Sequence, residues 1–412
     1  MSAAQHLAWR TRFRWFLAAG TATSAGDGIR LAGGPLLVAS VTSDPVLVGA
    51  SIFVQQMPWV VIALPAGAWI DRVDRARFLA IVTLLRSLIA LTVVALLLSG
   101  GIAVPVLLGT LFLMGVVEVM ADTTSGALLP ELVPSEHLAQ ANGRLGAVFV
   151  VGNQMVGPTV GALLFAVEPI WPFVVDAIAL VLAATCLTGL HRRHVRPSRP
   201  PSGPSTIRRD ISIGMRWLST NRPVRLLALL LAVMNVTFAA AFASWVLYVN
   251  VRLGLPPAAF GLLITASAVG GFTGSLIAPR LMRRFGATAL LRTGLIVEAA
   301  VLAILGTTQS PAIAGLAMLV FGAHAAVWGT VATTTRQRLV PEPMQGRIGS
   351  LYGLITMGGS AIGALIGGAI AQGTSLWTPF LIGAAIDVAF TLAVWRSLGR
   401  TMKIDNRGAE RT

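Results

Sequence analysis

The sequence Pro65-Ala66-Gly67-Ala68-Trp69-Ile70-Asp71-Arg72-Val73-Asp74-Arg75-Ala76-Arg77 places five charged residues between two long apolar segments. Residues 46–70 and 78–98 are each long enough to cross a bilayer core of about 30 Å, which takes roughly 20 residues. The stretch therefore predicts two membrane-spanning helices joined by a charged turn at the membrane surface. Charge is costly so close to lipid, which indicates that the turn has a function of its own.

The composition of the whole chain supports a membrane protein. Hydrophobic residues make up 55% and charged residues only 11%, whereas a soluble domain has about 25% charged residues. A net charge of +15 would also suit a nucleic-acid partner, but the arginines lie in short loops between apolar segments, so we expect none. The single cysteine, Cys186, lies in an apolar segment and excludes a disulfide framework.

Twelve segments have the length and hydrophobicity of spanning helices. The prediction is an all-α, polytopic membrane protein with twelve transmembrane helices. The segments are residues 14–41, 46–70, 77–99, 102–126, 138–166, 169–190, 223–250, 257–280, 287–307, 310–334, 344–373 and 376–397.

Basic residues alternate between the loops and predict the orientation of the chain. They precede the first segment and follow the second, eighth, tenth and twelfth, while the loops after segments one, three, five, nine and eleven contain no Lys or Arg. Because basic loops stay in the cytoplasm, both termini are expected there, in the cell membrane.

A hydrophilic stretch near the middle divides the chain into two similar halves. Residues 191–222 combine a Pro-rich linker with a basic amphipathic helix, which we expect on the inner leaflet. Leu132-Val133-Pro134 and Leu339-Val340-Pro341 are 207 residues apart, and so are the glycines Gly67 and Gly274. Two pseudo-symmetric six-helix bundles are therefore predicted, residues 1–190 and 223–412.

Several short motifs recur along the chain at defined places in the predicted helices. They are Gly26-Asp27-Gly28, Leu64-Pro65-Ala66-Gly67 with Asp71-Arg72-Val73-Asp74-Arg75, Ala127-Leu128-Leu129-Pro130 leading to Ala141-Asn142, and Gly157-Pro158-x2-Gly161. These motifs resemble those of major facilitator superfamily transporters, and within them the branch of enterobactin exporters and macrolide-efflux proteins. The resemblance covers the whole chain and implies a secondary transporter that works by alternating access.

The turn after residue 70 is interpreted as a conformational latch formed by Gly67, Asp71, Arg75 and Asp122. Asp71 would accept backbone N–H bonds at the start of the helix near residue 346, where the helix dipole favours an anion. Arg75 would pair with Asp122 at the cytoplasmic end of the fourth helix. Both contacts would stabilise the outward-open state; the alternative is a turn that only orients the chain.

Residues 152–161 contain Gly157, Pro158 and Gly161, and this motif resembles the glycine-proline motif of antiporters. Glycines four residues apart form a groove for a neighbouring helix, and proline bends the helix. We expect the groove to contact the other half of the protein, or to serve close packing alone. Asn153 and Gln154 are expected to face the transport cavity.

Charged residues in the middle of apolar segments point to the transport path, because each costs at least about 2.5 kcal/mol at the helix centre. Asp27 and Arg30 lie one turn apart and could form a structural pair or line the cavity. Glu118 and Asp122 also lie one turn apart, and two carboxylates this close favour proton binding, which suits Glu118 to proton uptake. Isolated polar groups are predicted at Asp176, Glu298, His324 and Asp387, and candidate cavity-wall residues are Trp245, Tyr248 and Trp328.

These observations favour a proton-coupled exporter of an amphipathic small molecule, such as a drug, a macrolide-like compound or a siderophore. An importer or uniporter is the alternative within the class, and a non-transporting or lipid-handling membrane protein is the alternative outside it. We expect no enzyme, cofactor or metal site, since no nucleotide-binding loop, nucleophile elbow or zinc motif occurs. Protons, the small-molecule substrate and the lipid bilayer are the expected partners of a monomer.

Overall fold

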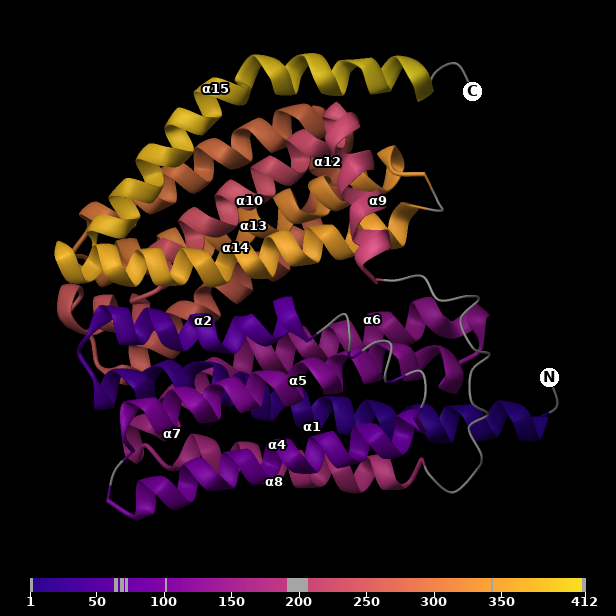
Figure 1. Cartoon of the computed structure of the whole chain (residues 1–412), viewed down its shortest axis with the longest axis vertical. Helices are drawn as coiled ribbons and strands as arrows, with labels where there is room; N and C mark the ends of the chain where they lie inside the picture. Colours follow the sequence, from indigo (N-terminus) through magenta and orange to yellow (C-terminus); the bar gives the residue numbers. More distant parts are fainter. Residues whose placement is uncertain are drawn as a thin grey trace. The chain divides into compact units, whose positions relative to one another are not determined.

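The computed structural model describes residues 3–62, 66, 70, 73–100, 102–190, 207–341 and 344–409, and every regular element in these ranges is a helix (Figure 1). The contacts divide the chain into two compact units. Unit 1 contains Met1–Ser43, Val54–Ser202 and Leu255–Thr265, and unit 2 contains Asp44–Phe53, Gly203–Gly254 and Ala266–Thr412. The bundle boundaries at residues 190 and 223 stay a prediction.

The first half of the chain forms nine elements. They are α1 (Ala3–Val41), α2 (Pro45–Val61), α4 (Arg75–Leu98), α5 (Val104–Leu132), the short 3-10 helix η1 (Ser135–His137), α6 (Leu138–Phe149), the π-helix η2 (Val150–Val156), α7 (Gly157–Val167) and α8 (Trp171–Thr188).

The second half continues with α9 (Ile207–Thr220), α10 (Arg222–Phe242), the single turn α11 (Trp245–Leu247), the π-helix η3 (Tyr248–Arg252), α12 (Pro257–Thr307), α13 (Pro311–Leu339), α14 (Gln345–Gly373) and α15 (Thr378–Ala409). The 51 residues of α12 include a kink at Gly286, whose φ of 74° lies in the left-handed region that glycine adopts readily.

The fold class predicted from the sequence is confirmed. Within the described residues, nine helices are long and apolar enough to span a membrane. One of them, α12, has 51 residues, and its two parts on either side of the kink at Gly286 match two predicted spans. The long α1, which is less apolar, and the shorter apolar α2 complete the predicted twelve.

Small residues let the helices of unit 1 approach closely. A Cβ atom at Gly161 would collide with the carbonyl oxygen of Ile29, and one at Gly157 would meet the backbone of Gly28. The groove glycines of α7 therefore pack on α1, and the expected contact of the groove with the second half of the chain stays a prediction. On another side of α7, the Pro158 carbonyl lies against Gly261, in the first turns of α12 that unit 1 includes.

The amphipathic helix α9 forms where the sequence predicts it and packs in part against protein, while its place on the inner leaflet stays a prediction. Leu218 is buried in the hydrophobic core of unit 2, and a Cβ at Gly214 would lie 2.9 Å from the Leu351 side chain on α14. At these positions α9 packs against protein, because Gly214 lets it lie close to α14. Within unit 2, α10 packs along α14 and α15.

Candidate functional site

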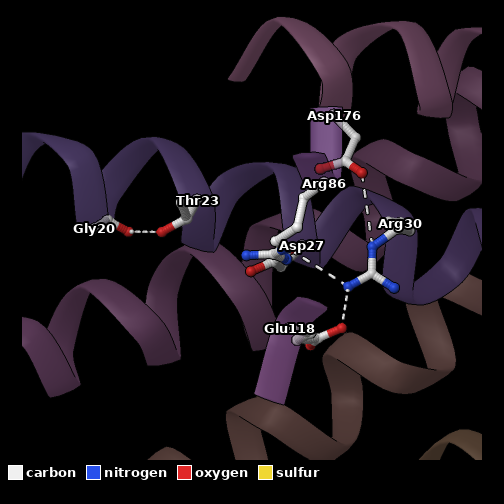
Figure 2. A network of polar contacts seen from close by, with 7 residues as sticks. All are labelled: Gly20, Thr23, Asp27, Arg30, Arg86, Glu118 and Asp176. Carbon is white, nitrogen blue, oxygen red and sulfur yellow. Dashed lines mark hydrogen bonds and ion pairs between the residues drawn. The ribbon is translucent and has the colours of Figure 1, made fainter. Parts of the chain in front are cut away.

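Five charged side chains from four helices of unit 1 meet in one group, which we call the Arg30 cluster (Figure 2). Arg30 Nη2 lies 2.8 Å from Glu118 Oε2 on α5 and 3.4 Å from Asp27 Oδ1 on α1. Arg30 Nε lies 3.6 Å from Asp176 Oδ2 on α8, and Arg86 on α4 pairs with Asp27. Arg30 therefore contacts three carboxylates at once.

The local sequence makes room for this cluster. A Cβ atom at Gly26 would lie 2.6 Å from Asp176 Oδ1, so glycine at this position allows α8 to bring its carboxylate against α1. One turn further along α1, Arg30 points toward the same carboxylate (Figure 2). The Gly26-Asp27-Gly28 motif thus supplies both a charged group and the space for its neighbours.

Burial differs strongly among the carboxylates. The Asp176 side chain is fully buried and that of Asp27 is 17% exposed, whereas that of Glu118 is 29% exposed. The two guanidinium groups are almost completely buried, with Arg86 at 2%. Of the three acids, Glu118 is therefore the one that water reaches most easily.

The charges of the cluster do not balance. Two guanidinium cations face three carboxylates, so full ionisation leaves one negative charge in excess. An uncompensated charge at this depth costs at least about 2.5 kcal/mol, and one bound proton removes it. The arrangement can therefore hold a proton or release it with a change of net charge.

Two members of the cluster were missed or misread from the sequence. Arg86 interrupts the apolar residues 77–99, and this position inside an apolar segment could have marked it as a candidate from the sequence. In the structure it is one of the largest fully buried side chains. Asp176, expected to be isolated, lies beside Arg30. The sequence of a uniformly apolar helix does not show which of its faces meets another helix. The partner of Asp176 could therefore not be predicted from the sequence.

The latch is only partly described, because Gly67 and Asp71 lie outside the described residues. Arg75 pairs with Glu131 and not with Asp122, which corrects the prediction. The reason is depth: α4 starts where the antiparallel α5 ends, and Asp122 lies nine residues, or about 13 Å, before Glu131 along α5. Arg75 Nη1 also lies 3.5 Å from the carbonyl oxygen of Ala127, and Asp122 is exposed.

The helix that contains Asn153 and Gln154 is not a regular α-helix. Pro158 has no N–H to donate to the carbonyl four residues earlier, and the turn before it is π-helical, with the Gly157 N–H bonded to the Gly152 carbonyl. Single π-helical turns of this kind occur frequently at functional sites. Gln154 is exposed and Asn153 half-buried, and their part in a cavity stays a prediction.

The polar residues of unit 2 expected to be isolated have partners. His324 Nε2 on α13 lies 3.4 Å from Glu298 Oε2 on α12, and Asp387 on α15 accepts a hydrogen bond of 3.0 Å from Thr237 on α10. These pairs were missed because the contacts join residues from separate helices, and single apolar segments do not show which faces meet.

The three aromatic residues predicted to line the cavity wall lie in the core of unit 2. Trp245 and Trp328 are each 5% exposed, and Tyr248 is fully buried, with its hydroxyl bonded to the carbonyl of Leu305. Trp245 and Tyr248 stack on each other with ring centroids 5.1 Å apart. They act as packing groups, and the prediction of wall residues is wrong.

Comparison with known proteins identifies the family. The model of the family described as transmembrane secretion effector matches residues 6–410. The chain belongs to this family of major facilitator transporters. It is therefore a multi-pass membrane transporter and not an enzyme.

This chain is also similar to individual proteins that agree with the assignment. It is similar to multidrug resistance protein 1 of Bacillus subtilis, with 25% identity over 90% of this chain and 93% of the relative. It is also similar to the enterobactin exporter EntS of Shigella boydii, with 25% identity over 81% and 79% of the two chains. A mutant of the nucleoside transporter NupG has the same fold, with a TM-score of 0.73 and 13% identity over 93% of this chain and 99% of that one.

Proposed function

We propose that this transporter exports an amphipathic or apolar small molecule, such as a drug, a macrolide-like compound or a siderophore, in exchange for protons. It would work as a monomer by alternating access, with both termini in the cytoplasm. The names of the relatives support export, since one is a multidrug resistance protein and the other an enterobactin exporter.

The excess carboxylate of the Arg30 cluster is the observation that carries proton coupling. A site whose net charge changes with one proton responds to a pH gradient. Because the Arg30 cluster joins four helices of one unit, the change in its charge can alter the contacts between these helices. Glu118 is the proton carrier in this proposal, because it is the most exposed of the three acids and, of the three, lies closest to Arg30.

The exchange of partners at Arg30 would link the proton to conformation. An ionised Glu118 holds Arg30 by a charge-assisted hydrogen bond of 2.8 Å, which is among the stronger polar contacts in proteins. A protonated Glu118 needs no cation, so Arg30 then interacts with Asp27 and Asp176 alone. The bound proton would in this way weaken the contact between α1 and α5.

The alternatives differ in their support. The nucleoside transporter is related at 13% identity, which shows the fold alone and does not favour import. A lipid-handling or scaffold role would not require a buried cluster with an unbalanced charge. Export coupled to protons is therefore the function that the site supports best.

A panel of labelled compounds tests this proposal in cells with and without the protein. The panel contains apolar drugs, macrolides and a catecholate siderophore, and accumulation is measured before and after a proton uncoupler is added. We expect at least one compound to accumulate less in cells with the protein, and the difference to vanish with the uncoupler. A difference that persists after uncoupling would contradict proton coupling, and higher accumulation with the protein would contradict export.

A further inference from the structure

A groove on unit 2 lies between the second part of α12 and α15. It has a volume of about 1000 Å³ and an apolar lining rich in alanine, including Ala300 and Ala389. Its wall on α15 extends from Ala384 to Arg396, which lie about 18 Å apart along the helix at 1.5 Å per residue. This length is close to the hydrocarbon thickness of one leaflet, since the whole core measures about 30 Å.

One polar group in the wall of the groove has no partner. Thr391 is 7% exposed, and its hydroxyl forms no hydrogen bond with any described residue. Threonines in helices normally donate to the carbonyl four residues earlier. Other threonines in unit 2 do so, among them Thr293, Thr307, Thr330, Thr335 and Thr356. A buried hydroxyl with an unused proton can donate to an acceptor that enters the groove.

The end of the groove beyond Thr391 is positively charged. Arg396 lines it, and Arg292 of α12 lies over the Trp395 ring with its guanidinium carbon 4.5 Å from the ring centroid. Arg292 also donates to the Trp395 carbonyl, which fixes the guanidinium at this end. In the predicted orientation this end faces the cytoplasm, where the leaflet contains anionic lipids.

We propose that the groove binds one anionic phospholipid of the inner leaflet. An acyl chain lies along the alanines, the phosphate binds Arg396 beside Arg292, and an ester carbonyl accepts a hydrogen bond from Thr391. Arg396 lies five positions after Thr391, which separates the two polar contacts by about 7 Å along the helix, so that the ester lies deeper in the membrane than the phosphate. This site is separate from the Arg30 cluster and does not depend on the transported substrate.

Native mass spectrometry of the purified full-length protein tests the proposal. Dioleoyl phosphatidylglycerol is compared with dioleoyl phosphatidylcholine, and glycerol phosphate serves as the headgroup without chains. We expect phosphatidylglycerol to bind more tightly than phosphatidylcholine and glycerol phosphate not to bind. Arg396→Gln should weaken phosphatidylglycerol binding about fivefold, which corresponds to one arginine at a membrane surface, and leave phosphatidylcholine binding unchanged.

Three variants complete the experiment. Ala300→Leu fills the groove and should weaken binding of both lipids, and Thr391→Val removes the hydroxyl at constant shape and should do the same. Arg338→Gln removes an exposed arginine from the end of α13, outside the groove, and should have no effect. Equal losses in Arg396→Gln and Arg338→Gln would overturn the proposal, as would unchanged binding in Ala300→Leu. Unchanged binding in Thr391→Val would overturn the assigned ester contact.

Discussion

At the scale of single residues, the arginines of unit 1 explain why so many acids can be buried in it. Asp27 contacts both Arg30 and Arg86, and Asp176 depends on Arg30. Buried charges are tolerated only when they are paired, so each guanidinium is needed as much for folding as for any transport step. The cluster should therefore respond to the loss of one member as a whole.

Removal of Arg86 should destabilise the protein strongly. Arg86→Ala leaves Asp27 with only its longer contact to Arg30, and breaking a buried ion pair from one side costs about 3–5 kcal/mol. Thermal unfolding of the purified protein in detergent measures the change. The matched control is Arg77→Ala on the same helix, whose side chain is exposed, and it should leave the unfolding temperature nearly unchanged. Equal effects of the two variants would show that the buried pair does not stabilise the fold.

At the scale of helices, close backbone packing positions the cluster. α1 contacts α5, α6, η2, α7 and α8, and it does so along surfaces rich in glycine. Gly161 lies against Ile29, the residue next to Arg30, so the packing of α7 helps to set the position of the guanidinium.

A methyl group at this contact should separate the two helices. Gly161→Ala places a Cβ against the Ile29 carbonyl and should destabilise the protein by about 1–3 kcal/mol, the usual cost of overpacking. Gly146→Ala on α6 adds a Cβ in open space and should stabilise its helix slightly. The difference in unfolding temperature between the two variants measures the effect. Similar unfolding temperatures would contradict the tight contact between α7 and α1.

The contact between the ends of α4 and α5 makes a separate prediction about transport. Arg75 binds Glu131, so Glu131→Gln and Arg75→Ala should both slow transport and bias the resting conformation toward the inward-open state. Asp122→Asn should have a smaller effect, because the exposed Asp122 is not the partner of Arg75. Cross-linking between cytoplasmic ends of helices, with transport measured in parallel, tests this. A stronger effect of Asp122→Asn than of Glu131→Gln would restore the original pairing.

At the scale of the whole molecule, the sequence was sufficient for the twelve helices but only partly for the site. Apolar length and loop charge predict spans directly, because lipid imposes both. The depth of Asp27, Arg30 and Glu118 marked them as candidates, and the structure brings these three together. The direction in which Asp176 points depends on how its helix is rotated about its axis. The Arg75–Glu131 pair depends on how deep the ends of the two helices lie. The π-helical turn before Pro158 depends on local hydrogen bonding. None of these follows from hydrophobic patterns.

The predicted orientation has its own test. With Cys186 replaced by serine, single cysteines at Asp44, Glu168 and Thr308 should react with an impermeant thiol reagent applied to intact cells. A cysteine at Arg77 should react only after the cells are opened, because basic loops stay in the cytoplasm. Labelling of the Arg77 position in intact cells would reverse the orientation and place the termini outside.

The central claim is that one proton on Glu118 couples the Arg30 cluster to transport, and Glu118→Gln tests it most directly. The variant mimics the protonated carboxyl group and is reconstituted in proteoliposomes with an imposed pH gradient. Asp122→Asn, one turn away on the same helix, is the control. We predict that Glu118→Gln loses gradient-driven transport but keeps counterflow exchange of substrate, while Asp122→Asn keeps both. Full gradient-driven transport by Glu118→Gln would contradict the account.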